Sequence, residues 1–234
     1  MKMLKSGFSK IGIELNDLQV EQFEVYYKLL CEWNEKFNLT AITEKEDVYL
    51  KHFIDSGICL CHEDINGKVI DVGTGAGFPG MVIKILKPDI DLTLLDSLNK
   101  RIDFLKCVGD NLGFKDITYI HSRAEDGGKD KNLRETFDFA VARAVANLST
   151  LSEYCMPFVK INGTFLSMKG PDAYAEIEAA TTAVHKLGGE VSGHTVYNLP
   201  DSDINHSIIS IKKIRQTPSC YPRKAGKPSK EPLK

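Results

Sequence analysis

Long hydrophobic runs are absent from this chain of 234 residues. No stretch approaches the roughly eighteen consecutive apolar residues that a membrane-spanning helix requires. The opening residues, Met-Lys-Met-Leu-Lys-Ser-Gly, also lack the long apolar core of a secretory signal peptide. We therefore expect a cytoplasmic protein with no membrane or export address.

Cysteine spacings typical of zinc and redox sites are absent as well. The chain has six cysteines and one Cys-x-Cys pair, but no Cys-x-x-Cys. An even number would permit disulfides, yet the chain lacks the short, loop-rich character of a stapled secreted domain. We expect reduced thiols and no metal site. The cysteines are Cys31, Cys59, Cys61, Cys107, Cys155 and Cys220.

Positive charge is scarce outside the C-terminal end. From Ile211 onward the chain carries eight lysines and arginines against Glu231 alone, which leaves 22 basic and 31 acidic residues in the rest of the chain. The body therefore has a formal charge of −9 and the end +7, although the total is only −2. A basic end on an acidic body suggests a local anionic partner. A solvated terminal tail is an equally open interpretation.

The remaining composition is that of an ordinary globular protein, with 42% hydrophobic residues. A chain of this length can bury one large core and carry an appendage. The pattern changes near residue 65 from helical to alternating strand and helix, and the basic end follows the last strand. We expect an N-terminal helical extension at 1–64, an α/β domain at 65–215 and a basic C-terminal tail at 216–234.

Two amphipathic helices are predicted in the extension. Apolar residues recur mainly at spacings of three or four over residues 16–37, with Asn16 or Asp17 placed to cap the helix. A second helix is predicted to begin at Thr43, where Thr43 and Glu46 match a capping box. Its apolar side continues toward residue 61.

From residue 68 the pattern alternates between strand and helix, which is typical of a parallel sheet with crossover helices on both faces. The predicted strands lie at 68–72, 91–95, 117–121, 137–142, 163–168, 190–197 and 206–214. The predicted helices lie at 79–86, 98–112, 147–158 and 172–188, with a short one near 130. Only a short loop joins the last two strands, so we expect that pair to be antiparallel. The fold class is α/β, a seven-stranded, doubly wound, Rossmann-like sheet.

A glycine-rich loop follows the first predicted strand, where residues 70–80 read Ile-Asp-Val-Gly-Thr-Gly-Ala-Gly-Phe-Pro-Gly. Such glycines let the backbone turn sharply and let a ligand approach closely. Pro79 is placed at the first position of the next helix. The pattern predicts a site for a nucleotide-like cofactor, built on Gly73, Gly75, Gly77 and Gly80.

Two acidic residues bear on which cofactor binds. Asp71, at the end of the strand, would repel a pyrophosphate but attract, directly or through water, the ammonium of a methionine moiety. Asp96 lies about twenty residues beyond the loop, where an acid accepts hydrogen bonds from ribose hydroxyls in either cofactor class. The loop therefore favours S-adenosylmethionine. A dinucleotide such as NAD, or a loop without a ligand, stays open as an alternative.

Several further segments, spread over nearly the whole chain, form a characteristic series. They are Trp33–Ile42, Lys51–Ser56, Asp71–Gly80, Ser122–Glu125, Ala142–Ala144, Met168–Gly170 and Tyr221–Leu233. Together these segments resemble one family, the small-subunit ribosomal RNA guanine-N7 methyltransferases, also called the glucose-inhibited division protein B family. The loop glycines alone are common, but this series is specific.

The resemblance implies a class I S-adenosylmethionine-dependent methyltransferase domain at 65–215. It further implies methylation of N7 of a single guanosine in the 530 loop of 16S rRNA, with 16S rRNA or the 30S subunit as partner. The resemblance implies cofactor contacts by Gly73, Phe78, Asp96, Ala124, Glu125 and Arg143. Asp71, Gly75 and Gly77, which the loop itself indicates, complete the predicted cofactor site. After Glu125 the chain departs from the family pattern with Asp-Gly-Gly-Lys-Asp-Lys, which predicts a flexible polar loop there.

Methylation at guanine N7 needs no catalytic base, because N7 presents an in-plane lone pair that is unprotonated at neutral pH. Aligning the reacting atoms can supply roughly 7–11 kcal/mol in favourable cases. The chain also lacks the Asn/Asp-Pro-Pro-aromatic turn of enzymes that methylate exocyclic amines, and Cys155 is expected to be a core residue. We therefore expect positioning residues only. The candidates are Asn38, His52, Asp55 and Arg143, although Asn38 could instead end a helix and His52 could be a packed residue.

Five cations are candidates for binding RNA phosphates or stacked bases: Arg123, Lys169, Arg223, Lys224 and Lys227. A surface salt bridge is the alternative for each. Truncation after Lys213 is expected to weaken RNA methylation and leave cofactor affinity intact.

Three other functions stay open on the sequence: a methyltransferase for a small molecule or protein, a nicotinamide oxidoreductase, and a non-catalytic RNA-binding or ribosome-assembly protein. One core accounts for the apolar helix faces, so we expect a monomer.

Overall fold

The structure is a computed structural model that describes residues 2–143, 146–171 and 173–234. Within these residues, seven strands form one sheet in the order β3-β2-β1-β4-β5-β7-β6. All neighbours from β3 to β5 pair in parallel, whereas β7 is antiparallel to both β5 and β6. The strands are β1 (Lys68–Val72), β2 (Asp91–Asp96), β3 (Thr118–His121), β4 (Phe137–Arg143), β5 (Val159–Lys169), β6 (Gly189–Asn198) and β7 (Asn205–Lys213). The predicted fold class, its strands and the antiparallel final pair are confirmed.

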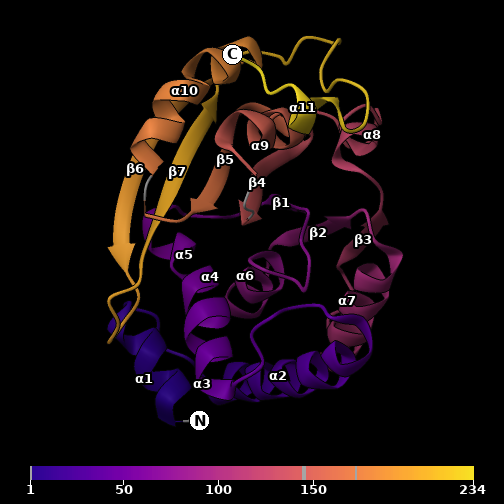
Figure 1. Cartoon of the computed structure of the whole chain (residues 1–234). Coiled ribbons are helices and arrows are strands. Elements are labelled where there is room, and N and C mark those ends of the chain that lie inside the picture. Colours follow the sequence, from indigo (N-terminus) through magenta and orange to yellow (C-terminus); the bar gives the residue numbers. More distant parts are fainter. Residues whose placement is uncertain (1, 144–145, 172) are drawn as a thin grey trace.

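The helices flank the sheet on both sides (Figure 1). Helices before and between β1 and β3 are α1 (Lys2–Lys10), α2 (Asp17–Phe37), α3 (Lys45–Val48), the π-helix η1 (Tyr49–Ile54), α4 (Asp55–Gly57), α5 (Cys59–His62), α6 (Gly80–Leu86) and α7 (Asn99–Asn111). The later helices are α8 (Ala124–Gly127), α9 (Leu148–Cys155), α10 (Ala173–Lys186) and α11 (Lys227–Lys230).

Side-chain alternation along the strands divides the interior into two cores. Val69 of β1 belongs to the core under α2, α6 and α7, whereas its neighbour Ile70 belongs to the core under α9 and α10. The same alternation separates Leu166 from Phe165 on β5. Successive residues of a strand point to opposite faces, so each strand supplies both cores. This arrangement also decides which residues of β1 can face a ligand.

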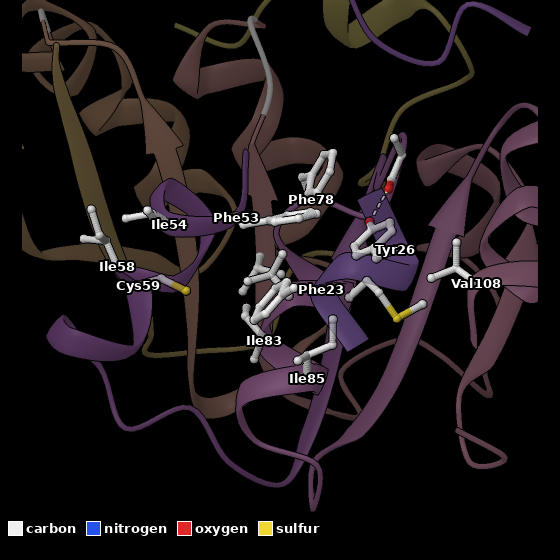
Figure 2. Close-up of a cluster of buried hydrophobic side chains, with 14 of the residues drawn as sticks. Phe23, Tyr26, Phe53, Ile54, Ile58, Cys59, Phe78, Ile83, Ile85 and Val108 are labelled. Carbon is white, nitrogen blue, oxygen red and sulfur yellow. Dashed lines mark hydrogen bonds between the residues drawn. The ribbon is translucent and has the colours of Figure 1, made fainter. Parts of the chain in front are cut away.

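The N-terminal helices are fastened to the glycine loop by aromatic packing. Figure 2 shows Tyr26 of α2, Phe53 of η1 and Phe78 of the loop gathered in one buried cluster. The Tyr26 ring lies 5.2 Å from the Phe53 ring and 5.6 Å from the Phe78 ring, and its hydroxyl donates to the carbonyl of Ala76. The extension therefore supports the loop directly.

The helix starts in the extension are partly as predicted. Asn16 caps α2 as predicted, with its side chain accepting from the Gln19 amide at 2.9 Å. The predicted capping box at Thr43 is wrong, because α3 begins at Lys45 and has no side-chain cap. Contacts with α2 hold this turn instead: the Lys45 ammonium lies 2.8 Å from Glu24.

Two further differences concern short elements. Helix α1 is not predicted by the sequence, since only Leu4 and Phe8 are buried on its nine residues and so short a pattern is weak. The short helix predicted near 130 is absent, and α8 lies immediately before it. The Arg134 guanidinium holds this region in a turn by donating to the carbonyls of Gly128 and Tyr221, each at 2.8 Å.

Among the helices of the described residues, none is long and apolar enough to cross a membrane. The same residues include no cluster of three or more His, Cys, Asp and Glu side chains that could hold a metal ion. All six cysteines are free thiols.

Candidate cofactor cleft and substrate-side pocket

A cleft of about 440 Å³ opens at the carboxyl ends of β1 and β2. Ligands of doubly wound sheets bind at this edge, next to the point where the strand order reverses, and here that point lies between β1 and β4. The volume falls within the range of roughly 300–1,000 Å³ that is typical of small-molecule sites. The lining residues are Val72, Gly73, Leu95, Ser97, Leu98, Ser122, Arg123, Ala124, Glu125, Ala146, Leu151, Tyr154 and Gly226.

Gly73 and Gly75 give the loop an open face. Both have left-handed backbones, with φ of 72° and 60°. A Cβ atom on Gly73 would meet no atom within 4 Å. Because Gly73 lines the cleft, its bare backbone leaves room for a ligand to approach closely. The loop thus fits the elongated, partly polar cofactor that the sequence predicts.

Gly77 and Phe78 lie inside the protein. A Cβ atom on Gly77, where φ is 97°, would clash with the Tyr26 hydroxyl. Phe78 is 6% exposed and stacks on His52 with ring centroids 4.5 Å apart. Neither residue is among those that line the cleft. Their positions fasten the loop to the N-terminal helices.

Asp71 lies beneath the loop, facing away from the cleft. Its side chain leaves β1 on the face opposite to that of Val72, which lines the cleft. One carboxylate oxygen accepts from Thr74 Oγ1 at 2.7 Å and from the Gly80 amide at 2.8 Å. Complete burial raises the pKa of Asp71 to about 6. The carboxylate organises the turn into α6, and its second oxygen, Oδ1, is buried without a hydrogen-bond partner among the described residues. The contact of Asp71 with a cofactor ammonium, directly or through water, stays a prediction.

Asp96 is at the tip of β2, as predicted, and its carboxylate shapes the cleft. It accepts from the amides of Gly75 and Leu98, each at 2.9 Å, and from Arg101 at 3.2 Å. A carboxylate offers about four acceptor positions, so one stays available for a ribose hydroxyl. Asp96 is only 1% exposed and is not among the residues that line the cleft, although its neighbours Leu95 and Ser97 are, so its contact with a ribose stays a prediction.

The far end of the cleft combines apolar walls with one buried acid. Leu98 and Tyr154 supply apolar surface, and Ala124 also lines the cleft. Glu125 is 6% exposed, and its Oε1 accepts from the Gly226 amide at 2.8 Å. The C-terminal segment, residues 216–234, therefore closes this end of the cleft. Truncation after Lys213 would remove Gly226 from the lining of the cleft, an arrangement that argues against the expected independence of the tail and the cofactor.

A second pocket, of about 370 Å³, lies beyond Arg143 at the ends of β4 and β5. We call it the Arg143 pocket. The Lys169 ammonium, which lines this pocket, donates to the carbonyl of Ala146, which lines the cleft, so the two hollows adjoin. The lining residues are Asp55, Arg143, Met168, Lys169, Gly170, Glu176, Tyr197 and His206.

Asp55 is the buried anion of the Arg143 pocket. It is 1% exposed and lies 2.8 Å from each of three donors, which are Arg143 Nη1, the Tyr197 hydroxyl and His206 Nδ1. Burial opposes ionisation, but the hydrogen bond from His206 and the charge of Arg143 outweigh it and hold the pKa of Asp55 below its ordinary value. Asp55 is therefore a fixed charge that orients Arg143.

His52 is a neutral partner of Arg143. Burial, followed by the charge of Arg143, lowers the pKa of His52 to about 4. Arg143 Nη2 lies 3.1 Å from His52 Nδ1, and because a guanidinium can only donate, this contact assigns Nδ1 as the acceptor and places the proton on Nε2, 2.9 Å from Thr40 Oγ1. The Lys51 carbonyl, 3.2 Å from Nδ1, competes for the same nitrogen and favours the other tautomer. Arg143 Nη1 also donates to the Lys51 carbonyl at 2.9 Å. The guanidinium is thus held from three directions.

The structure brings together three of the four positioning candidates, His52, Asp55 and Arg143. Asn38 does not join them. It is exposed and ends α2 with φ of 48°, which matches the alternative that Asn38 terminates a helix. Lys169, a predicted RNA contact, is 9% exposed and lies 2.8 Å from Glu176. Ala144, in one of the recurring segments, lies outside the described residues.

The other predicted RNA contacts differ in exposure. Arg123, Lys224 and Lys227 are exposed, and Lys227 lies 3.7 Å from Glu231. Arg223 is instead bound to the buried carboxylate of Glu153, at 2.6 Å from Nη2 to Oε2. Its guanidinium is therefore committed to a contact within the protein.

Sequence reasoning missed Tyr197 and His206. Both lie on the β6–β7 hairpin, more than a hundred residues from Asp55, and β7 brings them to the pocket by inserting between β5 and β6. No local motif marks either residue. The sequence predicts the hairpin that carries both residues, but the predicted hairpin does not show which of its side chains contact Asp55.

Comparisons with known proteins identify the family to which this site belongs. Residues 19–204 match the family described as rRNA small subunit methyltransferase G. Two proteins named ribosomal RNA small subunit methyltransferase G resemble the chain over 99% of its length and 98% of their own. That of Alkaliphilus metalliredigens is 51% identical, and that of Clostridium perfringens strain 13 is 48% identical.

Solved structures share the fold at low sequence identity. An S-adenosylmethionine-dependent methyltransferase of Leishmania major is 12% identical with a TM-score of 0.56, covering 80% of this chain and 83% of its own. The TYW2 protein of M. jannaschii, solved in complex with AdoMet, is 14% identical with a TM-score of 0.51, covering 64% and 70%. These likenesses show the fold, while the close relatives show the family and remove the nicotinamide alternative. The chain belongs to the rRNA small subunit methyltransferase G family, whose members are S-adenosylmethionine-dependent methyltransferases.

Proposed function

We propose that the protein transfers a methyl group from S-adenosylmethionine to N7 of a single guanosine in the 530 loop of 16S rRNA. The observation that supports this most directly is the adjacency of the cofactor cleft and the Arg143 pocket at one edge of the sheet. A donor in the first hollow and a base in the second would meet beside Arg143. The relatives are named as methyltransferases of small-subunit ribosomal RNA, which supports the class of reaction and of substrate.

The cleft residues suit S-adenosylmethionine along its whole length. Gly73 leaves space beside the loop, Asp96 retains one acceptor position for a ribose hydroxyl, and Leu98 and Tyr154 offer apolar walls to an adenine. Glu125 lines the same end. When bound, this cofactor supplies an electrophilic methyl group on a sulfonium. The protein's part is to orient the acceptor.

Three groups at the Arg143 pocket, namely Arg143, His52 and Asp55, suit the orientation of a base and not the movement of a proton. Arg143 carries a permanent charge, His52 is neutral above a pKa of about 4, and Asp55 is held ionised by its three donors. None of these groups is poised to exchange a proton near neutral pH. This matches an acceptor nitrogen that already has a free lone pair. The rate enhancement would then come from alignment.

Exposed cations are placed to contact RNA around the cleft. Arg123 lines its mouth, and Lys224 and Lys227 lie on the outer side of the C-terminal segment. The partner would be 16S rRNA or the 30S subunit, engaged by a monomer in the cytoplasm. Phosphate contacts of this kind make affinity fall as salt rises.

The test uses S-adenosylmethionine with a tritiated methyl group, small subunits from cells that lack the matching activity, and naked 16S rRNA as a second substrate. Methylation of N7 places a positive charge on the guanine, so borohydride followed by aniline should cleave the strand at the labelled nucleotide. One cleavage in the 530 loop is the expected result. Label on an exocyclic amine, or on protein or a small molecule alone, would overturn the proposal.

A further inference from the structure

The C-terminal segment forms part of the cofactor cleft. Figure 1 shows this segment, in yellow, passing beside α8 and α9 with α11 near its end. Gly226 lines the cleft, and Pro228 is buried, with its carbonyl accepting from Thr150 Oγ1 at 3.1 Å. The segment is therefore packed against the domain and does not extend into solvent.

One buried ion pair holds this segment in place. Glu153 of α9 is 0% exposed, and its carboxylate receives hydrogen bonds from the Arg223 amide at 2.8 Å, from Nε at 2.9 Å and from Nη2 at 2.6 Å. A buried carboxylate needs such partners, because leaving it unpaired is costly. Arg223 also reaches forward, since Nη2 donates to the Glu231 carbonyl at 2.8 Å. The guanidinium thus joins the two ends of the segment to α9.

Between those two ends lies the contact with the cleft. Gly226 has φ of 78°, which favours glycine, and its amide donates to Glu125 Oε1. Glu125 lines the end of the cleft that is lined by Tyr154 and Ala124. Arg223 is only three residues before Gly226, so anchoring the first fixes the position of the second.

We propose that Arg223 is a positioning residue for the cofactor: paired with Glu153, it holds the C-terminal segment as a wall around the adenosine end of the cleft. Its charge is used within the protein, and the neighbouring Lys224 carries the exposed charge. This inference rests on the assignment of the cleft to S-adenosylmethionine under the proposed function. Releasing the pair would free Gly226 from Glu125 and open the wall.

The test measures binding of adenosine and of S-adenosylmethionine by calorimetry in the full-length protein. We expect Arg223→Gln to weaken both ligands by about the same factor, roughly tenfold, because both contain the adenosine moiety. Lys224→Gln removes the same charge one residue later and is expected to leave both affinities unchanged. Arg223→Gln/Glu153→Gln avoids an unpaired buried charge and should bind as weakly as the single variant, with circular dichroism confirming the fold.

Trypsin supplies a readout that is independent of binding heat. Cleavage after Lys224 should be slow in the wild type, slower with adenosine, and fast in both Arg223 variants. Adenosine affinity within twofold of the wild type in the double variant would overturn the inference while leaving the proposed function intact. Wild-type protein that binds neither ligand would overturn the assignment of the cleft, and the inference with it.

Discussion

The cofactor cleft and the Arg143 pocket adjoin but are built in opposite ways. The cleft is shaped mainly by backbone, with Gly73 open to it and the Asp96 carboxylate holding the loop amide of Gly75. The Arg143 pocket is shaped by charged side chains from distant segments, with Asp55 on α4 and Arg143 on β4. The first depends on conformation and the second on a balance of charges, so the two should respond differently to substitution.

The largest expected effect comes from removing the central charge of the Arg143 pocket. Arg143→Ala should lower single-turnover methyl transfer at least about a hundredfold, since even small misplacement of a reacting group can cost that much. It should also lower the free energy of unfolding by up to about 3 kcal/mol, because Asp55 loses a partner in a buried site. Urea unfolding and rapid-quench assays measure the two quantities.

A second variant separates these effects. Arg143→Ala/Asp55→Asn removes both charges and should recover most of the stability without recovering methyl transfer. If transfer recovers together with stability, Arg143 serves only to balance Asp55, and the assignment of the pocket to the acceptor base is wrong.

Alanine variants of two loop glycines, Gly77 and Gly73, test whether backbone conformation determines the shape of the cleft. Gly77→Ala should reduce stability by about 2–4 kcal/mol, because an alanine there both adopts a left-handed backbone and clashes with Tyr26 and Leu105. Gly73→Ala has the same backbone problem but an unobstructed Cβ, so it should cost about 1–2 kcal/mol. Its methyl group enters the cleft, and calorimetry should show at least a tenfold loss of S-adenosylmethionine affinity. Equal losses of affinity in both variants, with equal stability, would contradict this difference.

The same contrast explains what could be predicted from the sequence. Strand and helix periodicity predicts the sheet, because burial on two faces repeats along each strand, and the short loop between the last two strands predicts that this pair is antiparallel. The glycine loop predicts the cleft, because its conformational requirement is local. The role of Asp71 is not decided by the local pattern, since strand alternation turns its side chain away from Val72 and into the turn before α6.

Long-range contacts account for most of what sequence reasoning missed. Tyr197 and His206 join Asp55 only because β7 inserts between β5 and β6. Arg223 was expected to contact RNA, since a basic tail is a common pattern, but its position depends on the buried Glu153 on another helix. The distribution of charge along a sequence predicts that a cation has an anionic partner. It does not show whether that partner is RNA or a carboxylate of the same protein.

The last expected effect concerns the pH dependence of stability and leaves the neutral-pH structure unchanged. His52 has a pKa of about 4 in the folded protein, against an ordinary value of 6.5, because burial and the charge of Arg143 disfavour protonation more than the Lys51 carbonyl and Asp55 favour it. Between those values the unfolded chain binds more protons than the folded protein, so stability falls as pH drops. The His52 contribution to the free energy of unfolding should be about 2 kcal/mol lower at pH 5 than at pH 7.

Urea unfolding of the wild type and of His52→Asn at both pH values isolates this contribution. Asparagine can still accept from Arg143 through its side-chain oxygen, but it does not titrate, so the variant should lose about 2 kcal/mol less than the wild type on acidification. Identical pH dependence in the two proteins would mean that His52 protonates freely in the folded state. The neutral imidazole beside Arg143, and the conclusion that this pocket orients a base without exchanging protons, would then both be wrong.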